Sequence, residues 1–143
     1  MSLALLVAMV VAGVSGVVLL VHLTGGGKPA RLADEAAALA RFALDFPDFD
    51  VRSVHLTREG DAAFLALGDG PMGARVGIVQ AVGGKFLTRV IAGRDLAGAP
   101  RAANATLMLR LGDFTWPGGM FTFAGPDEAR AVEGLLLALR GRT

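Results

Sequence analysis

The sequence predicts an α+β domain that follows an N-terminal transmembrane helix. Three observations support this: an uncharged apolar run over residues 2–23, strand-like alternation of apolar residues from residue 49, and helical spacing again from residue 126. The predicted parts are a transmembrane anchor over 1–23, a flexible hinge over 24–28, an amphipathic helix over 29–46 and a sheet domain over 49–143.

The apolar run Ser2–Leu23 contains no Asp, Glu, Lys or Arg. Its 22 residues, at about 1.5 Å each in a helix, span roughly 33 Å, close to the hydrocarbon thickness of a bilayer. A cleaved signal peptide has a basic start, a shorter apolar segment and a small-residue cleavage site, none of which is clear here. We therefore favour an uncleaved single-pass anchor, with a cleaved signal peptide and a buried core helix as the alternatives.

The charges that flank the run predict its orientation. No Lys or Arg precedes it, whereas Lys28 and Arg31 follow it closely and Arg41 lies further on. Because positive flanks stay in the cytoplasm, the domain is expected on the cytoplasmic side of the inner membrane.

Small residues recur every four positions within the anchor, at Ala4, Ala8, Ala12 and Gly16. This spacing places them on one helix face, where two membrane helices can approach closely. A homodimer through this face is one interpretation, and the general abundance of alanine in such anchors is the other.

Composition excludes several classes of function. All 14 basic and all 13 acidic residues lie after residue 27, so the domain has nearly balanced charge and no basic excess for nucleic acid. The chain has no cysteine, which excludes disulfides and thiolate metal sites.

Helical spacing predicts an amphipathic helix over 29–46, with Pro29 in its first turn and Phe46-Pro47 at its end. Its opposite face offers two i,i+4 ion pairs, Arg31 with Glu35 and Arg41 with Asp45. That face carries both signs of charge, so packing on the domain is favoured over lying on a membrane. The predicted apolar stripe consists of Leu32, Ala36, Leu39, Ala43 and Phe46.

Alternation and turn residues predict six strands joined by hairpins. Gly83-Gly84 and Pro117-Gly118-Gly119 mark two of the turns, the latter as a type II turn. A short seventh strand is placed at Asp95–Ala97, and a final helix begins at Pro126 with the apolar stripe Ala129, Val132, Leu135, Leu136 and Leu139. The six strands are predicted at Phe49–Leu56, Ala62–Leu67, Arg75–Ala81, Lys85–Ile91, Thr106–Trp116 and Met120–Phe123.

Consecutive hairpins closed by one C-terminal helix, with Phe121-x-Phe123 leading into Pro126–Leu139, resemble the pleckstrin-homology-like (PH-like) fold and its small bacterial versions. The resemblance covers about Phe49 to Arg140 and implies a bent sheet, or partly open barrel, closed by that helix. It implies binding or scaffolding more than catalysis. Lipid-binding members carry several Lys and Arg around the first hairpin, where this chain has Arg58 beside Glu59 and Asp61, so no lipid pocket is assigned. An ordinary α+β sheet with two helices on one face is the alternative.

No residue is assigned as catalytic, cofactor-binding or metal-ligating. His22 and His55 lack partners at ligand spacing, and the glycine-rich Gly68–Gly73 lacks the lysine of a phosphate-binding loop. The acids Asp45, Asp48, Asp50, Glu59 and Asp61 are expected to be solvated turn residues.

Two groups of side chains are candidates for contact with a partner. Arg75, Lys85 and Arg89 are expected on one sheet face, facing solvent or an acidic surface. Phe114, Trp116, Phe121 and Phe123 are expected to pair across their hairpin as core residues, and Trp116 is the candidate contact residue if it is exposed.

The sequence therefore predicts a non-enzymatic, membrane-anchored scaffold or protein-binding module without a cofactor. The alternatives are a membrane-tethered lipid or small-ligand sensor and a tethered hydrolase that uses two of the Asp45–Asp61 carboxylates in one cleft. The first predicts an exposed apolar patch and the second a concave apolar pocket.

Overall fold

The computed structural model describes residues 2–23, 30–68 and 73–141 and confirms the α+β class. The predicted hinge, Pro29 and most of Gly68–Gly73 lie outside these residues. The elements are α1 (Leu3–Leu23), α2 (Glu35–Asp45), β1 (Val51–Leu56), β2 (Ala62–Leu67), β3 (Val76–Val82), β4 (Lys85–Ile91), the 3₁₀ helix η1 (Gly93–Asp95), β5 (Arg101–Ala103), β6 (Thr106–Arg110), β7 (Gly118–Thr122) and α3 (Pro126–Gly141).

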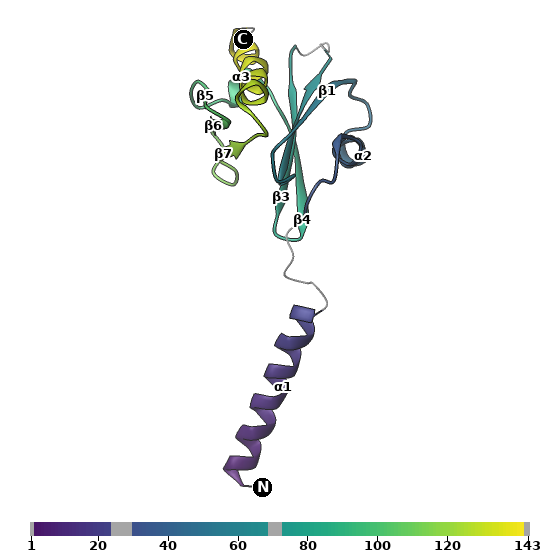
Figure 1. The fold of residues 1–143 in the computed structure, drawn as a ribbon, viewed down its shortest axis with the longest axis vertical. Coiled ribbons are helices and arrows are strands. Elements are labelled where there is room, and N and C mark those ends of the chain that lie inside the picture. The colour runs from purple at the N-terminus through teal and green to yellow at the C-terminus, as the bar shows by residue number, and fades with distance from the viewer. Residues whose placement is uncertain (1, 24–29, 69–72, 142–143) are drawn as a thin grey trace.

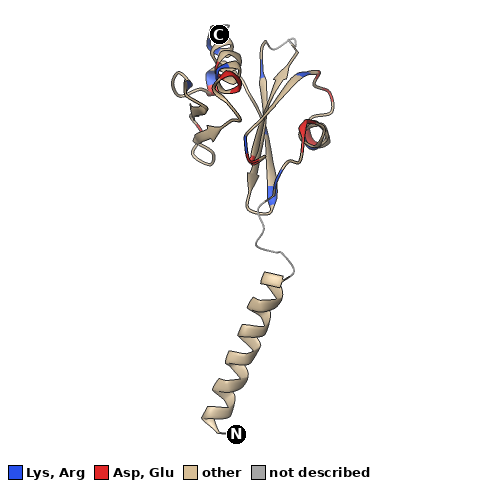
Figure 2. Ribbon diagram, in the orientation of Figure 1, with Lys and Arg blue, Asp and Glu red and all other residues tan. Residues whose placement is uncertain are grey.

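Helix α1 is long and apolar enough to cross a membrane, and none of its residues is buried. It carries no charged side chain, whereas both signs of charge occur on the domain (Figure 2). The absence of burial contradicts the alternative of a core helix.

The strands form two antiparallel sheets, one of order β1-β2-β3-β4 and one of order β5-β6-β7. The four-stranded sheet lies between α2 on one side and the three-stranded sheet with α3 on the other (Figure 1). One bridge, Thr57 with Phe123, joins the sheets at a corner, and they do not close into a barrel. This arrangement is compatible with the PH-like resemblance.

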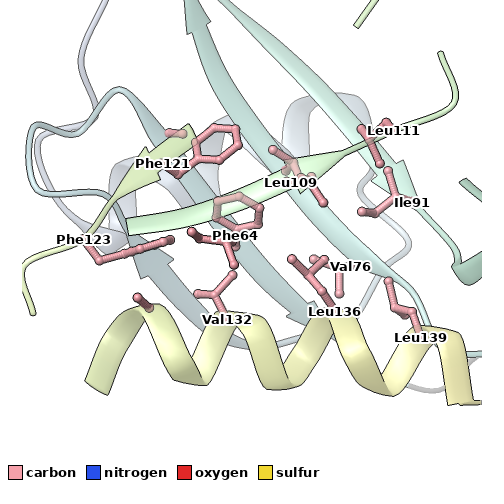
Figure 3. Close-up of a cluster of buried hydrophobic side chains, with 14 of the residues drawn as sticks. Phe64, Val76, Ile91, Leu109, Leu111, Phe121, Phe123, Val132, Leu136 and Leu139 are labelled. Carbon is pink, nitrogen blue, oxygen red and sulfur yellow. The ribbon is translucent and has the colours of Figure 1, made fainter. Parts of the chain in front are cut away.

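An inner core lies between the two sheets and α3. Phe64 of β2 meets Phe121 of β7 edge-to-face, with ring centroids 5.0 Å apart. The predicted α3 stripe is confirmed: Val132, Leu136 and Leu139 point into this core (Figure 3). Its members are Ala62, Phe64, Val76, Ile78, Ile91, Leu107, Leu109, Leu111, Trp116, Phe121, Phe123, Ala129, Val132, Leu136 and Leu139.

An outer core lies on the opposite face of the four-stranded sheet, under α2. Strand β2 contributes alternate residues to both cores, so all six of its residues are buried and it reads AAFLAL without a polar position. The members of the outer core are Leu32, Ala38, Phe42, Ala63, Leu65, Leu67 and Val79.

The helix predicted over 29–46 is shorter in the structure. The Ala30 and Leu32 N–H groups donate to the carbonyls of Gly83 and Gly60, at 2.8 and 2.7 Å, so this segment runs along the sheet instead of coiling. Asp34 then caps α2, since its side chain accepts a hydrogen bond from the Ala37 N–H at 2.8 Å.

The predicted apolar stripe of this helix is also wrong in part. Ala38 and Phe42 are the buried residues of α2, whereas Leu39 is 43% exposed and Ala36 and Ala43 face outward. The reason is the fit of Phe42 over Gly77, where a Cβ atom would lie 2.6 Å from the Phe42 ring.

Of the two ion pairs predicted for this helix, one forms and the other does not. Arg41 and Asp45 pair at 3.4 Å, as predicted. Arg31 instead donates from Nε to the carbonyl oxygen of Glu59 at 2.7 Å, because it lies before the start of α2.

The strand predictions need two corrections. The last hairpin has a seven-residue loop over 111–117, because β6 ends at Arg110 and Gly118 already pairs with it, so the predicted Pro117-Gly118 type II turn is wrong. The seventh strand exists as β5 at Arg101–Ala103, while Asp95–Ala97 contains the end of η1 and a single bridge from Leu96 to Leu111.

Candidate functional site

A hollow on the described part of the domain follows the outer edge of β4, and we name it the β4 groove. Its volume is about 680 Å³. Residues from the end of α2, from β4, from η1 and from the 111–117 loop surround it. They are Phe46, Thr88, Arg89, Val90, Ile91, Arg94, Asp95, Leu111, Gly112, Asp113 and Phe114.

Strand β4 is an edge strand, because it pairs with β3 alone. The two-residue turn Gly83-Gly84, in which Gly83 has φ of +62°, fixes which backbone groups face outward. Alternate residues from Lys85 bond to β3, so Phe86, Thr88 and Val90 direct their N–H and C=O groups away from the sheet. Within the described residues these outward groups have no hydrogen-bond partner.

Hydrogen bonds cover parts of two other sheet edges. The Ala102 N–H of β5 donates to the Glu133 carboxylate of α3. At the corner between the sheets, the Arg58 N–H donates to the Thr122 carbonyl at 2.8 Å beside the Thr57–Phe123 bridge. Strand β1, which pairs with β2 alone, is the other edge strand of the four-stranded sheet, and β4 is the edge along which the groove runs.

A chain of side-chain contacts holds the 111–117 loop on the sheet. Arg89 forms an ion pair with Asp113, and its guanidinium lies 5.5 Å from the centroid of the Trp116 ring. The Trp116 indole N–H donates to the Gln80 side-chain oxygen. Between these fixed residues, Phe114 is fully exposed at the rim of the groove.

The Asp113 carboxylate is held in its ionised form. Hydrogen bonds from the Thr115 side chain and backbone, at 2.8 and 2.9 Å, together with Arg89, lower its pKa from 3.8 to about 2. The Arg89–Asp113 ion pair is therefore maintained well into the acidic range.

Two polar groups of the groove are left without a partner in the described structure. The Thr88 hydroxyl oxygen is buried and has no hydrogen bond. Arg94, exposed on η1, takes part in no ion pair or hydrogen bond among the described residues. A buried hydroxyl and a free guanidinium are groups that a bound ligand can satisfy.

The residues singled out in the sequence are dispersed. His55 Nδ1 lies 2.6 Å from Glu128 Oε1, which ties β1 to the start of α3, and His22 lies at the end of α1. Glu59 and Asp61 border a small hollow of about 240 Å³ with Arg58 and Thr122, and Asp61 also accepts a hydrogen bond from Thr57. The described residues contain no group of three or more side chains suited to a metal ion.

The predicted aromatic and basic groups also separate. Trp116 is only 8% exposed, so the condition for its role as a contact residue is not met, and it belongs with Phe121 and Phe123 to the inner core, as expected. Phe114 lies in a loop and pairs with none of them. Lys85 and Arg89 lie on β4, whereas Arg75 precedes β3.

A shallow hollow also runs along α1, lined by Leu3, Ala4, Val7, Ala8, Val11 and Ala12. It follows the small-residue face, and no atom lies within 4 Å of a Cβ built on Gly16. Pairing of two anchors through this face stays a prediction.

Sequence reasoning missed the importance of Thr88, Arg94 and the exposed Phe114. The available signal was the pair Gly112-Asp113 ahead of Thr115, since an Asp that binds the backbone two residues on marks a turn and not a continuing strand.

Comparisons of the chain with protein-family models, curated proteins and solved structures give no match.

Proposed function

We propose that this protein is a non-enzymatic, membrane-anchored scaffold that binds a protein partner through the β4 groove. The observation that carries the proposal is the groove itself, where an unpaired strand edge and the exposed Phe114 lie together. Exposed aromatic rings beside unsatisfied polar groups are typical of partner-binding surfaces.

The proposed anchor is α1, and the proposed location is the cytoplasmic face of the inner membrane. The length and apolar character of α1 support a membrane span, and the complete exposure of its side chains fits a helix surrounded by lipid. Lys28 and Arg31 after the helix support the cytoplasmic orientation.

We place the domain in the PH-like class. Four antiparallel strands, three further strands and a closing C-terminal helix support this, with α2 as an addition outside the basic fold. The first hairpin presents Arg58 beside Glu59 and Asp61, which favours a protein over an anionic lipid as the partner. Fold alone does not determine function, so the proposed function rests on the groove and not on the fold.

A membrane-tethered sensor of a lipid or small ligand is the second candidate. The volume of the β4 groove, about 680 Å³, falls in the range of small-molecule sites, and this observation favours the sensor. Partial neutralisation of its charges by the Arg89–Asp113 pair favours the protein partner.

Topology and cross-linking test the proposal together. A C-terminal tag should survive protease treatment of spheroplasts, and cross-linking in intact cells should capture one specific protein. Digestion of the tag would overturn the cytoplasmic orientation. A protected tag without any captured protein would overturn the scaffold and favour the sensor.

A further inference from the structure

We infer that the β4 groove binds an extended segment of the partner as an added strand, with an acidic side chain of that segment opposite Arg94. This inference rests on the proposed function and names the form of partner that the groove accepts.

The backbone of β4 supplies the first argument. Phe86, Thr88 and Val90 direct three N–H and three C=O groups outward at alternate positions. An extended chain is the ligand whose own donors and acceptors repeat with this spacing, and such strand addition is an established mode of peptide recognition.

The walls of the groove supply the second argument. Phe46 borders one side of the β4 edge, while Leu111 and Phe114 border the other. Because successive side chains of a strand point to opposite faces, an added strand places alternate side chains against these two apolar walls. The segment is therefore expected to carry apolar residues on both faces.

Polar groups supply the third argument and indicate that the bound segment carries an acidic residue at one end. Thr88 Oγ1 is buried without a partner at the middle of the edge, where an added strand brings new donors. Arg89 is already paired with Asp113, whereas Arg94 beyond the end of β4 has no acidic partner among the described residues. An Asp or Glu at the end of the segment nearest Ile91 satisfies Arg94.

A second exposed apolar surface is the alternative binding site for a partner, and it provides the control position for the cross-linking experiment. On the outer face of the three-stranded sheet, Met108 and Met120 lie opposite each other and are 44% and 68% exposed. The edge strand at that face is β7, which pairs with β6 alone, so a partner bound there would not add a strand to β4.

The experiment uses the full-length chain. A photo-cross-linking amino acid replaces Phe114, and a second variant carries it in place of Met120. After irradiation of intact cells, mass spectrometry identifies the cross-linked segment. That segment, made as a synthetic peptide, is then bound to the full-length protein in lipid nanodiscs.

The matched variants separate backbone from side-chain binding. Thr88→Pro removes the outward N–H, which edge strands tolerate, and is expected to weaken peptide binding about tenfold or more. Thr88→Val keeps the N–H and C=O and loses only the hydrogen bond of the hydroxyl, so it should weaken binding clearly less than Thr88→Pro does. Arg94→Glu should weaken binding about tenfold through repulsion of the acidic residue.

Amide hydrogen exchange of the unsubstituted protein gives a readout that does not depend on any variant folding. Bound peptide should slow exchange at Thr88 and Val90 and leave Leu87 and Arg89, which already bond to β3, nearly unchanged. Circular dichroism verifies the fold of each variant.

Four outcomes overturn the inference. Cross-links from Met120 but not Phe114 would keep the scaffold and move its binding surface. A cross-linked segment belonging to a second copy of this chain would replace the partner by a dimer. Equal binding by Thr88→Pro and Thr88→Val, or unchanged exchange at Thr88 and Val90, would exclude strand addition while keeping the groove. No cross-link from either position, together with no captured protein, would overturn the scaffold as well.

Discussion

At the scale of single residues, Gly77 determines how α2 packs on the sheet. Glycine in a strand is normally unfavourable, because it adds flexibility and no side chain to pack. Here its missing Cβ provides the space for the Phe42 ring, which is fully buried and stacks on Phe46 with centroids 5.3 Å apart.

Replacing this glycine should therefore destabilise the domain. Gly77→Ala is expected to lower the free energy of unfolding by about 1–3 kcal/mol, because Phe42 must shift. Phe42→Leu in the same chain should recover part of the loss that Gly77→Ala causes. Chemical denaturation of the four-member mutant cycle measures the coupling, and strictly additive effects would contradict the contact.

The Asp113 carboxylate leads to a prediction about pH. Its pKa is depressed to about 2, so its contribution to stability is complete above about pH 4 and is lost as the pH falls through about 2. Thr115→Val removes the side-chain hydrogen bond and should raise this pKa toward 3.8, so the contribution is lost at higher pH.

Carboxyl NMR titration checks this prediction. Thr115→Ser keeps the hydroxyl and should leave the Asp113 pKa close to that of the parent. A Thr115→Val protein with an unchanged pKa would show that the backbone hydrogen bond and Arg89 suffice.

At the scale of elements, α3 is attached to both sheets through one buried stripe. Leu136 is 0% exposed in the inner core, while the adjacent Leu137 is 41% exposed. Leu136→Ala should cost about 2–5 kcal/mol of unfolding free energy, whereas Leu137→Ala should change it by about 0.5 kcal/mol or less. Thermal denaturation compares the two, and similar losses would contradict this assignment of the buried face.

The elements predicted best from the sequence are those with strong local signals. Strands β2 and β4 and the start of α3 were predicted at their observed positions, from continuous or alternating apolar residues and from Pro126 followed by two acids. The α2 stripe failed because its orientation depends on a distant glycine. Strand β5 failed because its three residues, Arg101–Ala103, carry no hydrophobic period.

The candidate site was less accessible to sequence reasoning. The basic residue Arg89 was noted, but its pairing with Asp113 and its contact with Trp116 bring together residues distant in the chain. The groove exists because β4 happens to be the last strand of its sheet, and strand order is a tertiary property that local patterns do not contain.

At the scale of the whole molecule, a short tether limits how far the domain lies from the proposed anchor. Ala30 is hydrogen-bonded to Gly83, and seven Cα–Cα steps connect it to Leu23. At about 3.5 Å a step, the β3–β4 turn lies within roughly 25 Å of the end of α1. With α1 in the bilayer, the β3–β4 turn therefore lies close to the membrane surface, and the Ile91 end of the groove lies further from it.

Single-cysteine labelling tests this placement without interference, because the chain contains no cysteine. A fluorophore on Lys85→Cys should transfer energy to acceptor lipids more efficiently than one on Asp50→Cys. The reason is that Asp50 precedes β1 at the other end of the sheet, about 20 Å away along the strand. Equal transfer from the two positions would contradict the placement.

The burial of Trp116 has a spectroscopic consequence. It is the sole tryptophan of the chain, and it lies within the 111–117 loop, in contact with Arg89 and Gln80. Its emission therefore arises from one site and should lie at short wavelength in the native protein. The surroundings of the Trp116 ring change when the groove is occupied. They also change when the loop is released at low pH and when the inner core is lost. The intrinsic fluorescence of Trp116 therefore reports on the candidate binding surface in membranes, without an added label.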